Sequence, residues 1–190
     1  MPLQLTIAGC NGAGKTTTAA FSLHQETMGF SQFVNAGEIA RGLSPFNPDS
    51  VAFEAGRIMR TRIQQLLKKK QDFAIETTLS TRSYGKLLTY VRLSGYEAHL
   101  LFYYLISTDL TLQRVAERVR FGGLNIPSDI VVRLYYKGLQ NLAQLFILLC
   151  DVWKVNHNSS SLQVLIAKDE MKKPTSIFNA SLWGKINSIG

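Results

Sequence analysis

Short apolar runs alternate with longer segments of helical periodicity along most of the chain. The runs that read as strands cover residues 3–8, 33–34, 73–75, 99–106 and 162–167. The segments that read as helices cover residues 17–28, 51–70, 84–94, 108–119 and 127–149. This alternation predicts an α/β fold in which a mainly parallel sheet carries helices on both faces. Ligands of such sheets bind beyond the carboxyl ends of the strands.

The pattern is that of one domain spanning residues 1–190. This length is sufficient for a single hydrophobic core, and the sequence shows no internal repeat. A glycine pair, Gly122 and Gly123, interrupts the segment of residues 114–133, which is predicted to be a lid over the ligand site. Residues 170–190 form a tail to which the pattern assigns no structure.

A phosphate-binding loop lies between the first strand and the first helix. Residues 9–16 read GCNGAGKT and match the pattern G-x-x-x-x-G-K-[ST] completely. Glycines let backbone amides curl around a phosphate, and the start of the helix adds about half a positive charge. Lys15 is expected to reach the outer phosphates, and the Thr16 hydroxyl to coordinate Mg²⁺. The residues expected to hold ATP or GTP are Gly9, Asn11, Gly12, Ala13, Gly14, Lys15, Thr16 and Thr17.

Composition restricts the cellular setting. No apolar run is long enough to cross a membrane, and Met1-Pro2-Leu3 leads directly into the first strand without room for a signal peptide. Two cysteines, Cys10 and Cys150, fit a reduced cytoplasm better than a disulfide framework. The net charge of +8 is compatible with nucleic-acid binding, but basic residues around polyphosphate explain it equally well. We therefore expect a cytoplasmic protein that binds neither nucleic acid nor membrane.

Polar side chains follow the second and third predicted strands. Asn35-Ala36-Gly37-Glu38 follows the second strand, and Glu76-Thr77-Thr78 follows the third. We expect Glu76 to coordinate Mg²⁺, directly or through water, or to accept a hydrogen bond from a substrate hydroxyl. The alternative for this residue is a solvated surface carboxylate.

Three arginines precede the glycine pair of the predicted lid. Arg114 and Arg118 share one helix face, and Arg120 lies near the helix end. An arginine on a lid can neutralise the charge that spreads over a transferring phosphoryl group, which raises rates by about 10³–10⁵ in well-studied cases. We expect at least one of the three to act on phosphate. The alternative for each is a solvated face that pairs with Glu117.

Several short segments, spread over residues 3–167, are weak signals alone and specific together. They read VNAGEIA at 34–40, GLSP at 42–45, AFEAGR at 52–57, FAIETTLS at 73–80, RVAERV at 114–119, and Gly122-Gly123 followed by Ile126-Pro127. In combination with the phosphate-binding loop, they resemble the zeta toxin family of P-loop kinases.

The resemblance implies a P-loop kinase sheet of five strands in the order 2-3-1-4-5. It also implies transfer of the γ-phosphoryl group of ATP or GTP to the 3′-hydroxyl of a UDP-activated amino sugar, typically UDP-N-acetylglucosamine. In toxin–antitoxin systems this reaction drains a cell-wall precursor, and a small antitoxin protein blocks the nucleotide site.

Individual positions of the sequence match the functional residues of the family. Lys15 and Thr16 match its nucleotide and magnesium residues, and Arg114 or Arg118 matches its lid arginine. Glu76 and Thr78 match its substrate-side strand end. The full set of positions expected to contact the acceptor is Asn35, Glu38, Glu54, Arg57, Glu76, Thr77 and Thr78.

Gly37 is the most important departure from the family pattern. Most members carry aspartate at this catalytic position, in an Asn-Ala-Asp motif, and it is taken to be the base that accepts the proton of the sugar hydroxyl. Glycine has no side chain for this role, and base catalysis contributes about 10²–10⁴-fold. Glu38 is adjacent, but a side chain one residue along is expected to point elsewhere. We therefore expect impaired turnover with nucleotide binding retained.

Two smaller departures and two other functions complete the sequence analysis. Leu124 stands where members of the family usually carry a polar or basic residue, and His157 stands where they usually carry an aspartate. Two explanations of Gly37 stay open: engineered attenuation of a toxic kinase, or natural drift. One alternative function is a P-loop kinase of another small hydroxyl compound or nucleoside. The other is a nucleotide-binding module that has lost catalysis and acts through a protein partner.

Overall fold

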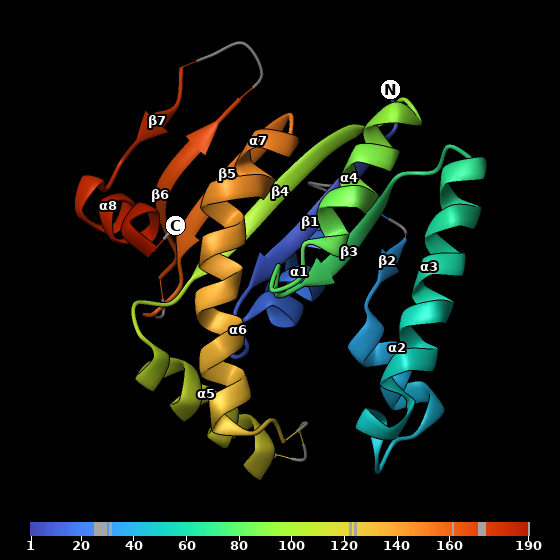
Figure 1. The fold of residues 1–190 in the computed structure, drawn as a ribbon, viewed down its shortest axis with the longest axis horizontal. Coiled ribbons are helices and arrows are strands. Elements are labelled where there is room, and N and C mark those ends of the chain that lie inside the picture. The colour runs from blue at the N-terminus through green and yellow to red at the C-terminus, as the bar shows by residue number, and fades with distance from the viewer. Residues whose placement is uncertain are drawn as a thin grey trace.

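The computed structural model of the chain has an α/β fold built on one twisted sheet (Figure 1). It describes residues 1–24, 30, 32–121, 123, 125–160, 162–170 and 174–189. Within these residues the sheet has seven strands in the order β2-β3-β1-β4-β5-β6-β7. All pairs from β2 to β5 are parallel, whereas β6 and β7 are added in antiparallel orientation.

The elements follow one another in the strand–helix alternation that the sequence predicts. The strands are β1 (Leu3–Gly9), β2 (Phe33–Val34), β3 (Phe73–Thr77), β4 (Glu97–Tyr104), β5 (Val152–His157), β6 (Val164–Asp169) and β7 (Ser176–Ile177). The helices are α1 (Lys15–His24), α2 (Ala36–Leu43), α3 (Ala52–Lys68), α4 (Ser83–Leu93), α5 (Thr108–Arg120), α6 (Ser128–Asn141), α7 (Ile147–Leu149) and α8 (Ala180–Ile189). A 3₁₀ turn (Pro48–Val51) precedes α3, and a π-helical turn (Leu142–Phe146) joins α6 to α7.

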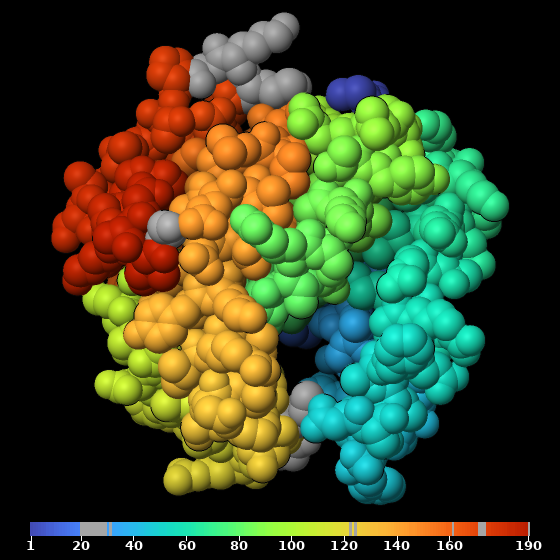
Figure 2. Space-filling view, viewed as in Figure 1, coloured from blue at the N-terminus to red at the C-terminus, as the bar shows by residue number. Residues whose placement is uncertain are grey.

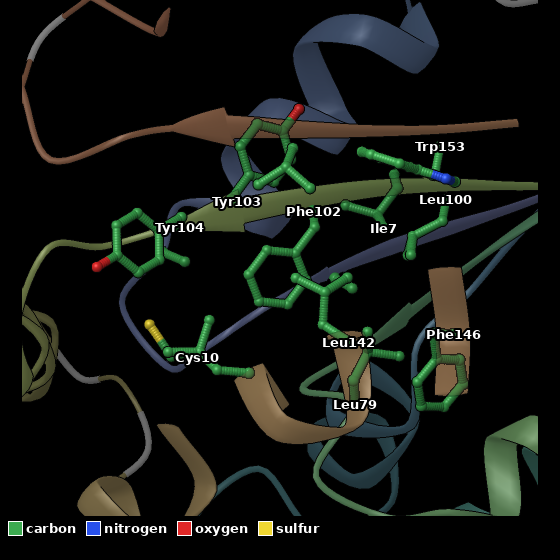
Figure 3. Packing of buried hydrophobic residues seen from close by; sticks show 14 of the residues in the cluster. Ile7, Cys10, Leu79, Leu100, Phe102, Tyr103, Tyr104, Leu142, Phe146 and Trp153 are labelled. Carbon is green, nitrogen blue, oxygen red and sulfur yellow. The ribbon is translucent and has the colours of Figure 1, made fainter. Parts of the chain in front are cut away.

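Helices cover both faces of the sheet, as predicted. In Figure 1, α4, α6 and α7 lie in front of the strands and α1 lies behind them. Successive residues of β4 serve the two faces, because side chains alternate along a strand. Figure 3 shows Phe102 directed toward Leu142 on one side and Tyr103 directed to the opposite side. Burial raises the pKa of the Tyr103 phenol to about 12, and its hydrogen bond with Thr18 of α1 opposes this.

The parallel order 2-3-1-4-5 is confirmed, but the sequence named the wrong segment as the fifth strand. β5 (Val152–His157) occupies that place, and the segment predicted at 162–167 corresponds to β6, one position further out and antiparallel. β5 was missed because it alternates buried Trp153 and Val155 with exposed Lys154, which is a weaker signal than a continuous apolar run. The five-stranded prediction also omitted β7.

Helical regions show two further differences from the sequence prediction. The helix expected for residues 127–149 is divided, because the π-helical turn separates α6 from α7. The tail beyond residue 170 contributes β7 and α8, which had not been assigned. Trp183 of α8 stacks on Trp153 of β5 with ring centroids 5.3 Å apart, so the tail packs against the sheet.

No helix in the described parts of the chain is sufficiently long and apolar to cross a membrane. Both cysteines are free thiols, as predicted: Cys10 is buried in the phosphate-binding loop, and Cys150 lies between α7 and β5. Burial raises the pKa of the Cys150 thiol to about 12, which makes it a poor nucleophile near neutral pH.

Helix α6 fixes the backbone just beyond β3. Leu79 is fully buried with φ +56°, a left-handed conformation that costs a non-glycine residue about 1–3 kcal/mol. The Asn141 side chain, itself buried, donates through Nδ2 to the Leu79 carbonyl at 2.7 Å. Gly138 allows close contact, because a Cβ there would lie 2.6 Å from the Thr78 carbonyl oxygen. The turn that carries Thr77 and Thr78 is therefore held by α6.

We predict that Asn141→Ala destabilises the protein by about 1–3 kcal/mol, because it leaves the buried Leu79 carbonyl without its donor. Urea unfolding followed by circular dichroism measures the free energy of unfolding. Gln140→Ala is the matched control, since it removes an exposed amide from the same helix. Equal stability losses in the two variants would contradict the assigned role of Asn141.

Candidate functional site

The phosphate-binding loop joins β1 to α1, as the sequence predicts, and two of its glycines are sterically required. A Cβ at Gly9 would lie 2.5 Å from the Tyr103 carbonyl oxygen of β4. Gly12 has φ +76°, and a Cβ there would lie 2.9 Å from the Cβ of Arg114 in α5. The loop is therefore pressed between β4 and α5, with room only for glycine at these positions.

The loop presents donors suited to an anion. Asn11 Nδ2 is buried, and no hydrogen-bond partner for it is found among the described residues. Lys15, Thr16 and Thr17 form the first turn of α1, where backbone amides have no acceptor within the helix. A helix start of this kind, preceded by a glycine-rich loop, fits a bound phosphate.

Lys15 is buried at this helix start, with 7% of its surface exposed. Its Nζ donates to the Cys10 carbonyl at 2.9 Å and lies 3.9 Å from Glu76 Oε1. Burial lowers the pKa of Lys15, and the negative charge of Glu76 partly offsets that effect. Among the described residues, the buried ammonium group is therefore compensated by the Glu76 carboxylate and the Cys10 carbonyl.

Glu76, at the end of β3, connects the loop to α2. Thr16 Oγ1 donates to Glu76 Oε2 at 2.8 Å, and Asn35 Nδ2 donates to the same oxygen at 3.0 Å. Asn35 also caps α2, because its Oδ1 accepts from the amides of Gly37 at 2.8 Å and Glu38 at 3.4 Å. One short network therefore sets the positions of the loop, the strand end and the start of α2.

Thr16 and Glu76 bring a hydroxyl and a carboxylate oxygen side by side, which are the oxygen ligands that Mg²⁺ prefers. Mg²⁺ usually keeps several waters and takes only one or two protein ligands next to phosphates. No group of three or more His, Cys, Asp or Glu side chains suited to a metal occurs in the described part of the chain. The donor set therefore fits a phosphate-linked Mg²⁺ rather than a metal held by protein alone.

Two adjoining cavities open above the loop. We call the first the loop cavity, which has a volume of about 740 Å³ and includes Gly12, Gly14, Thr17, Arg114 and Phe121 in its lining. The second, the strand-end cavity, has a volume of about 380 Å³ and is lined among others by Asn11, Asn35, Gly37, Thr77, Thr78 and Ile126. Figure 2 shows the surface hollowed between α6 on one side and α2 with α3 on the other.

A small set of side chains lines both cavities and marks their junction. These side chains are Lys15, Thr16, Glu38, Arg41, Glu76 and Arg118. Three of them are cationic and two are carboxylates, so the junction combines groups that stabilise phosphate with groups that can hold a proton or a metal. A phosphoryl group passing from one cavity to the other would cross this boundary.

The three arginines of the predicted lid have different environments. Arg114 donates to the carbonyl oxygens of Gly12 at 3.3 Å, Asn158 at 2.9 Å and Ser159 at 3.1 Å. Its guanidinium thus braces the phosphate-binding loop against the segment after β5. Arg120 is exposed and does not line either cavity.

Arg118 is the lid arginine that lies at the junction. Burial lowers its pKa, the like charge of Arg41 adds to this effect, and Glu76 opposes it. Gly123 packs tightly beneath it, because a Cβ at Gly123 would lie 2.5 Å from Arg118 Cγ. Gly122 and Leu124, the other lid positions discussed in the sequence analysis, lie outside the described residues.

The residues expected to contact an acceptor are only partly brought together. Asn35, Glu38, Glu76, Thr77 and Thr78 all line the strand-end cavity, together with Gly37, which the sequence predicted to be the catalytic position. Glu54 and Arg57, by contrast, are exposed on α3, and Arg57 lines a separate shallow depression with Ile58 and Arg62. Any acceptor role of these two residues stays a prediction.

Sequence reasoning did not assign Arg41 and Asn158. Arg41 lines both cavities, and Asn158 Nδ2 donates to the Ala13 carbonyl of the loop at 2.7 Å. In the sequence, the one sign that these residues belong to the site is their position: Arg41 lies between the segments 34–40 and 42–45, and Asn158 follows His157. His157, next to Asn158, is half-buried, and its pKa is lowered by burial and by Arg114.

Comparison with known proteins identifies relatives of the chain. The zeta toxin family model matches residues 38–170. An uncharacterized protein of Haemophilus influenzae strain Rd is 29% identical over 127 residues, which cover 67% of this chain and 88% of that protein.

Solved structures of similar fold include chains of a two-protein complex and of a toxin–antitoxin system. A chain of the AvrRxo1-ORF1:AvrRxo1-ORF2 complex with sulphate ions has a TM-score of 0.79 and 17% identity, covering 100% of this chain and 64% of that chain. The same complex with ATP gives a TM-score of 0.74 at 16% identity, again over 100% of this chain and 64% of that one. A chain of the PezAT toxin–antitoxin system of Streptococcus pneumoniae gives 0.68 at 16% identity, over 94% and 75%. The present chain therefore spans slightly less than two thirds of the AvrRxo1 chain.

We predict that Arg114→Met destabilises the protein by about 1–3 kcal/mol, because it removes a donor from three backbone carbonyls. Thermal and urea unfolding measure the loss. Arg120→Met, an exposed arginine of the same helix, should change the free energy of unfolding by at most about 0.5 kcal/mol. Equal effects of the two substitutions would show that Arg114 is not a structural brace.

Proposed function

The chain belongs to the zeta toxin family, and from this membership we propose that it is a P-loop phosphotransferase. The proposed reaction transfers the γ-phosphoryl group of ATP or GTP to the 3′-hydroxyl of a UDP-N-acetylamino sugar, with UDP-N-acetylglucosamine as the first candidate. The observation that carries the proposal is the junction between the loop cavity and the strand-end cavity, where Lys15, Glu76 and Arg118 meet.

The loop cavity is the proposed nucleotide site. Loop amides would hold the phosphates, and Lys15 would contact the outer ones. Thr16 and Glu76 would hold Mg²⁺, which when bound supplies charge neutralisation between the phosphates. The ATP complex of the structurally similar AvrRxo1 protein supports nucleotide as the ligand.

The strand-end cavity is the proposed acceptor site, and it continues into a groove. This groove lies between α3 and α4, has a volume of about 460 Å³, and shares Ala36 and Tyr84 with the strand-end cavity. Arg60 and Lys86 provide cations in its lining, and Tyr90 provides a second aromatic surface beside Tyr84. Cations and aromatic rings are suited to the diphosphate and base of a nucleotide sugar.

The residues at the junction have distinct proposed roles. Lys15 and Arg118 stabilise the charge that develops on the transferring phosphoryl group, an electrostatic effect that is strong because both groups are partly or fully withdrawn from water. Thr78 and its hydrogen-bond partner Ser80, whose hydroxyls lie 2.8 Å apart, offer polar contacts to the acceptor. Gly37 offers no proton acceptor at the position where most family members have one.

A second candidate function is a nucleotide-binding module that acts through a protein partner. Phe121 is 91% exposed and lines the loop cavity. Exposed aromatic side chains around a ligand site are typical of a surface that another protein covers. The AvrRxo1-ORF1:AvrRxo1-ORF2 complex and the PezAT toxin–antitoxin system support an antitoxin as that partner.

We predict that Gly37→Asp raises turnover with UDP-N-acetylglucosamine by about 10²-fold, because it adds a carboxylate base at the position where most family members carry one. A Cβ at Gly37 would lie 3.2 Å from Asn35 Oδ1, so the fold admits this side chain if the Asn35 cap shifts by a few tenths of an ångström. The measurement is formation of phosphorylated UDP-sugar with ATP and Mg²⁺, and calorimetric titration of ATP is the binding control.

Each other outcome of this experiment has a defined meaning. Tight ATP binding without turnover in either protein would favour the partner-dependent module. Turnover of other hydroxyl compounds but of no UDP-sugar would favour a kinase with a different small substrate. Absence of ATP and GTP binding would contradict the proposed function.

We predict that Arg60→Ala, assayed in the Gly37→Asp protein, raises the KM for the UDP-sugar by about tenfold and leaves the KM for ATP unchanged, because one phosphate-binding cation is lost. Lys68→Ala removes an exposed cation from the same helix outside the three cavities, and it should change neither constant. Equal KM effects of the two substitutions would place the diphosphate elsewhere.

A further inference from the structure

Glu38 is a carboxylate at the junction of the two cavities. The sequence predicted that Glu38 contacts the acceptor but points away from the place of the missing base, and the side chain lines both the loop cavity and the strand-end cavity. The other carboxylate at the junction, Glu76, accepts hydrogen bonds from Thr16 and Asn35. Glu38 makes no comparable bond to the loop or to β3 among the contacts described.

The Glu38 carboxylate is held by a cation of its own helix. Arg41 Nη1 donates to Glu38 Oε1 at 3.1 Å, and the two side chains are 44% and 50% exposed respectively. The Asn35 cap fixes the backbone of Glu38 at the start of α2, while the Glu38 carboxylate remains accessible. An exposed pair of this type contributes little stability, so it can be rearranged at low cost.

Arg41 belongs to the same cluster of positive charge as Lys15 and Arg118. It lines both cavities, and its charge contributes to the lowered pKa of Arg118. A phosphate group at the junction would attract Arg41 and compete with Glu38 for its guanidinium. Arrival of the nucleotide would therefore loosen the ion pair at the time when a base is needed.

The absent side chain at position 37 leaves space beside Glu38. Apart from the adjacent residues and the backbone of α2, a Cβ built at Gly37 meets only Asn35 Oδ1, at 3.2 Å, within 4 Å. Gly37 itself lines the strand-end cavity, so the open space adjoins the proposed acceptor site. A carboxylate on a longer side chain at the next position can extend into this space.

We propose that Glu38 accepts the proton of the acceptor hydroxyl in this chain, in place of the side chain that Gly37 lacks, and that Arg41 holds Glu38 until phosphate binds. The inference rests on the phosphotransferase activity proposed above. In the step, the hydroxyl oxygen forms a bond to the γ-phosphorus while its proton passes to a Glu38 oxygen. The bond between the γ-phosphorus and the β–γ bridging oxygen breaks, and its electron pair leaves on the nucleoside diphosphate. Glu38 then returns the proton to solvent.

The experiment compares Glu38→Gln in two backgrounds, the native chain and the Gly37→Asp variant. Turnover of ATP and UDP-N-acetylglucosamine is measured as phosphorylated sugar formed. We expect Glu38→Gln to lower kcat by about 10²-fold in the native chain, because the glutamine amide is not a base. In the Gly37→Asp background, where aspartate supplies the base, we expect a loss below about tenfold.

Matched controls separate catalysis from folding. Glu97→Gln removes a carboxylate that also pairs with a basic side chain, His99, but lies at the start of β4, away from the carboxyl ends of the strands. It should leave kcat unchanged in both backgrounds. ATP affinity, measured by calorimetry, should be retained in both Glu38→Gln proteins, which shows that the nucleotide site is intact.

Three results would overturn the inference. The first is an unchanged rate after Glu38→Gln in the native chain. The second is an equal loss in both backgrounds, which indicates a structural role. The third is a native chain without turnover beside an active Gly37→Asp variant, because Glu38 then cannot serve as the base although the proposed function stands. Absence of turnover in both backgrounds with every UDP-sugar would instead contradict the proposed function.

Discussion

Burial of the Lys15 ammonium is the constraint on which the arrangement of the site depends. A buried ion costs several kcal/mol unless an opposite charge and hydrogen bonds compensate for it. The compensation comes from Glu76 and the Cys10 carbonyl. The parallel pairing of β1 and β3 supplies the carboxylate, because it sets Glu76 beside Ile7, shortly before the loop begins. Glu76 in turn accepts hydrogen bonds from Thr16 and Asn35. One carboxylate therefore connects the loop, β3 and α2.

A rigid frame supports this charged centre from the other side. Arg114 braces the loop against the segment after β5, and Asn141 holds the left-handed Leu79 backbone beyond β3. Both use side-chain donors to satisfy backbone carbonyls, which fixes main-chain positions without closing the cavities. Pre-positioned donors need no rearrangement when a charged ligand arrives, which is the property that electrostatic catalysis requires. The exposed pair Glu38 and Arg41 is the contrasting element, because little holds it in a single arrangement.

The junction of the two cavities explains how the family reaction and the glycine at position 37 can coexist. In the proposed reaction, phosphate stabilisation is distributed over Lys15, Arg118 and the loop amides, so it would not depend on the side chain at position 37. Proton transfer would depend on a carboxylate within reach of the acceptor hydroxyl. The proposal therefore assigns binding and chemistry to different elements, α1 with α5 for phosphate and the start of α2 for the proton.

The sequence by itself determined the phosphate-binding loop, the alternation of strand and helix segments and the polar strand ends. Each of these depends on residues that are contiguous in the chain, so its geometry is local. Only the tertiary structure decided that Arg114 braces the loop from 102 residues away, that β5 takes the fifth place, and that Glu38 reaches the junction. The physical reason is that the destination of a long side chain depends on which distant elements pack around it. The sequence pattern fixes which residues share a helix face or strand end, and packing then selects the atoms that meet.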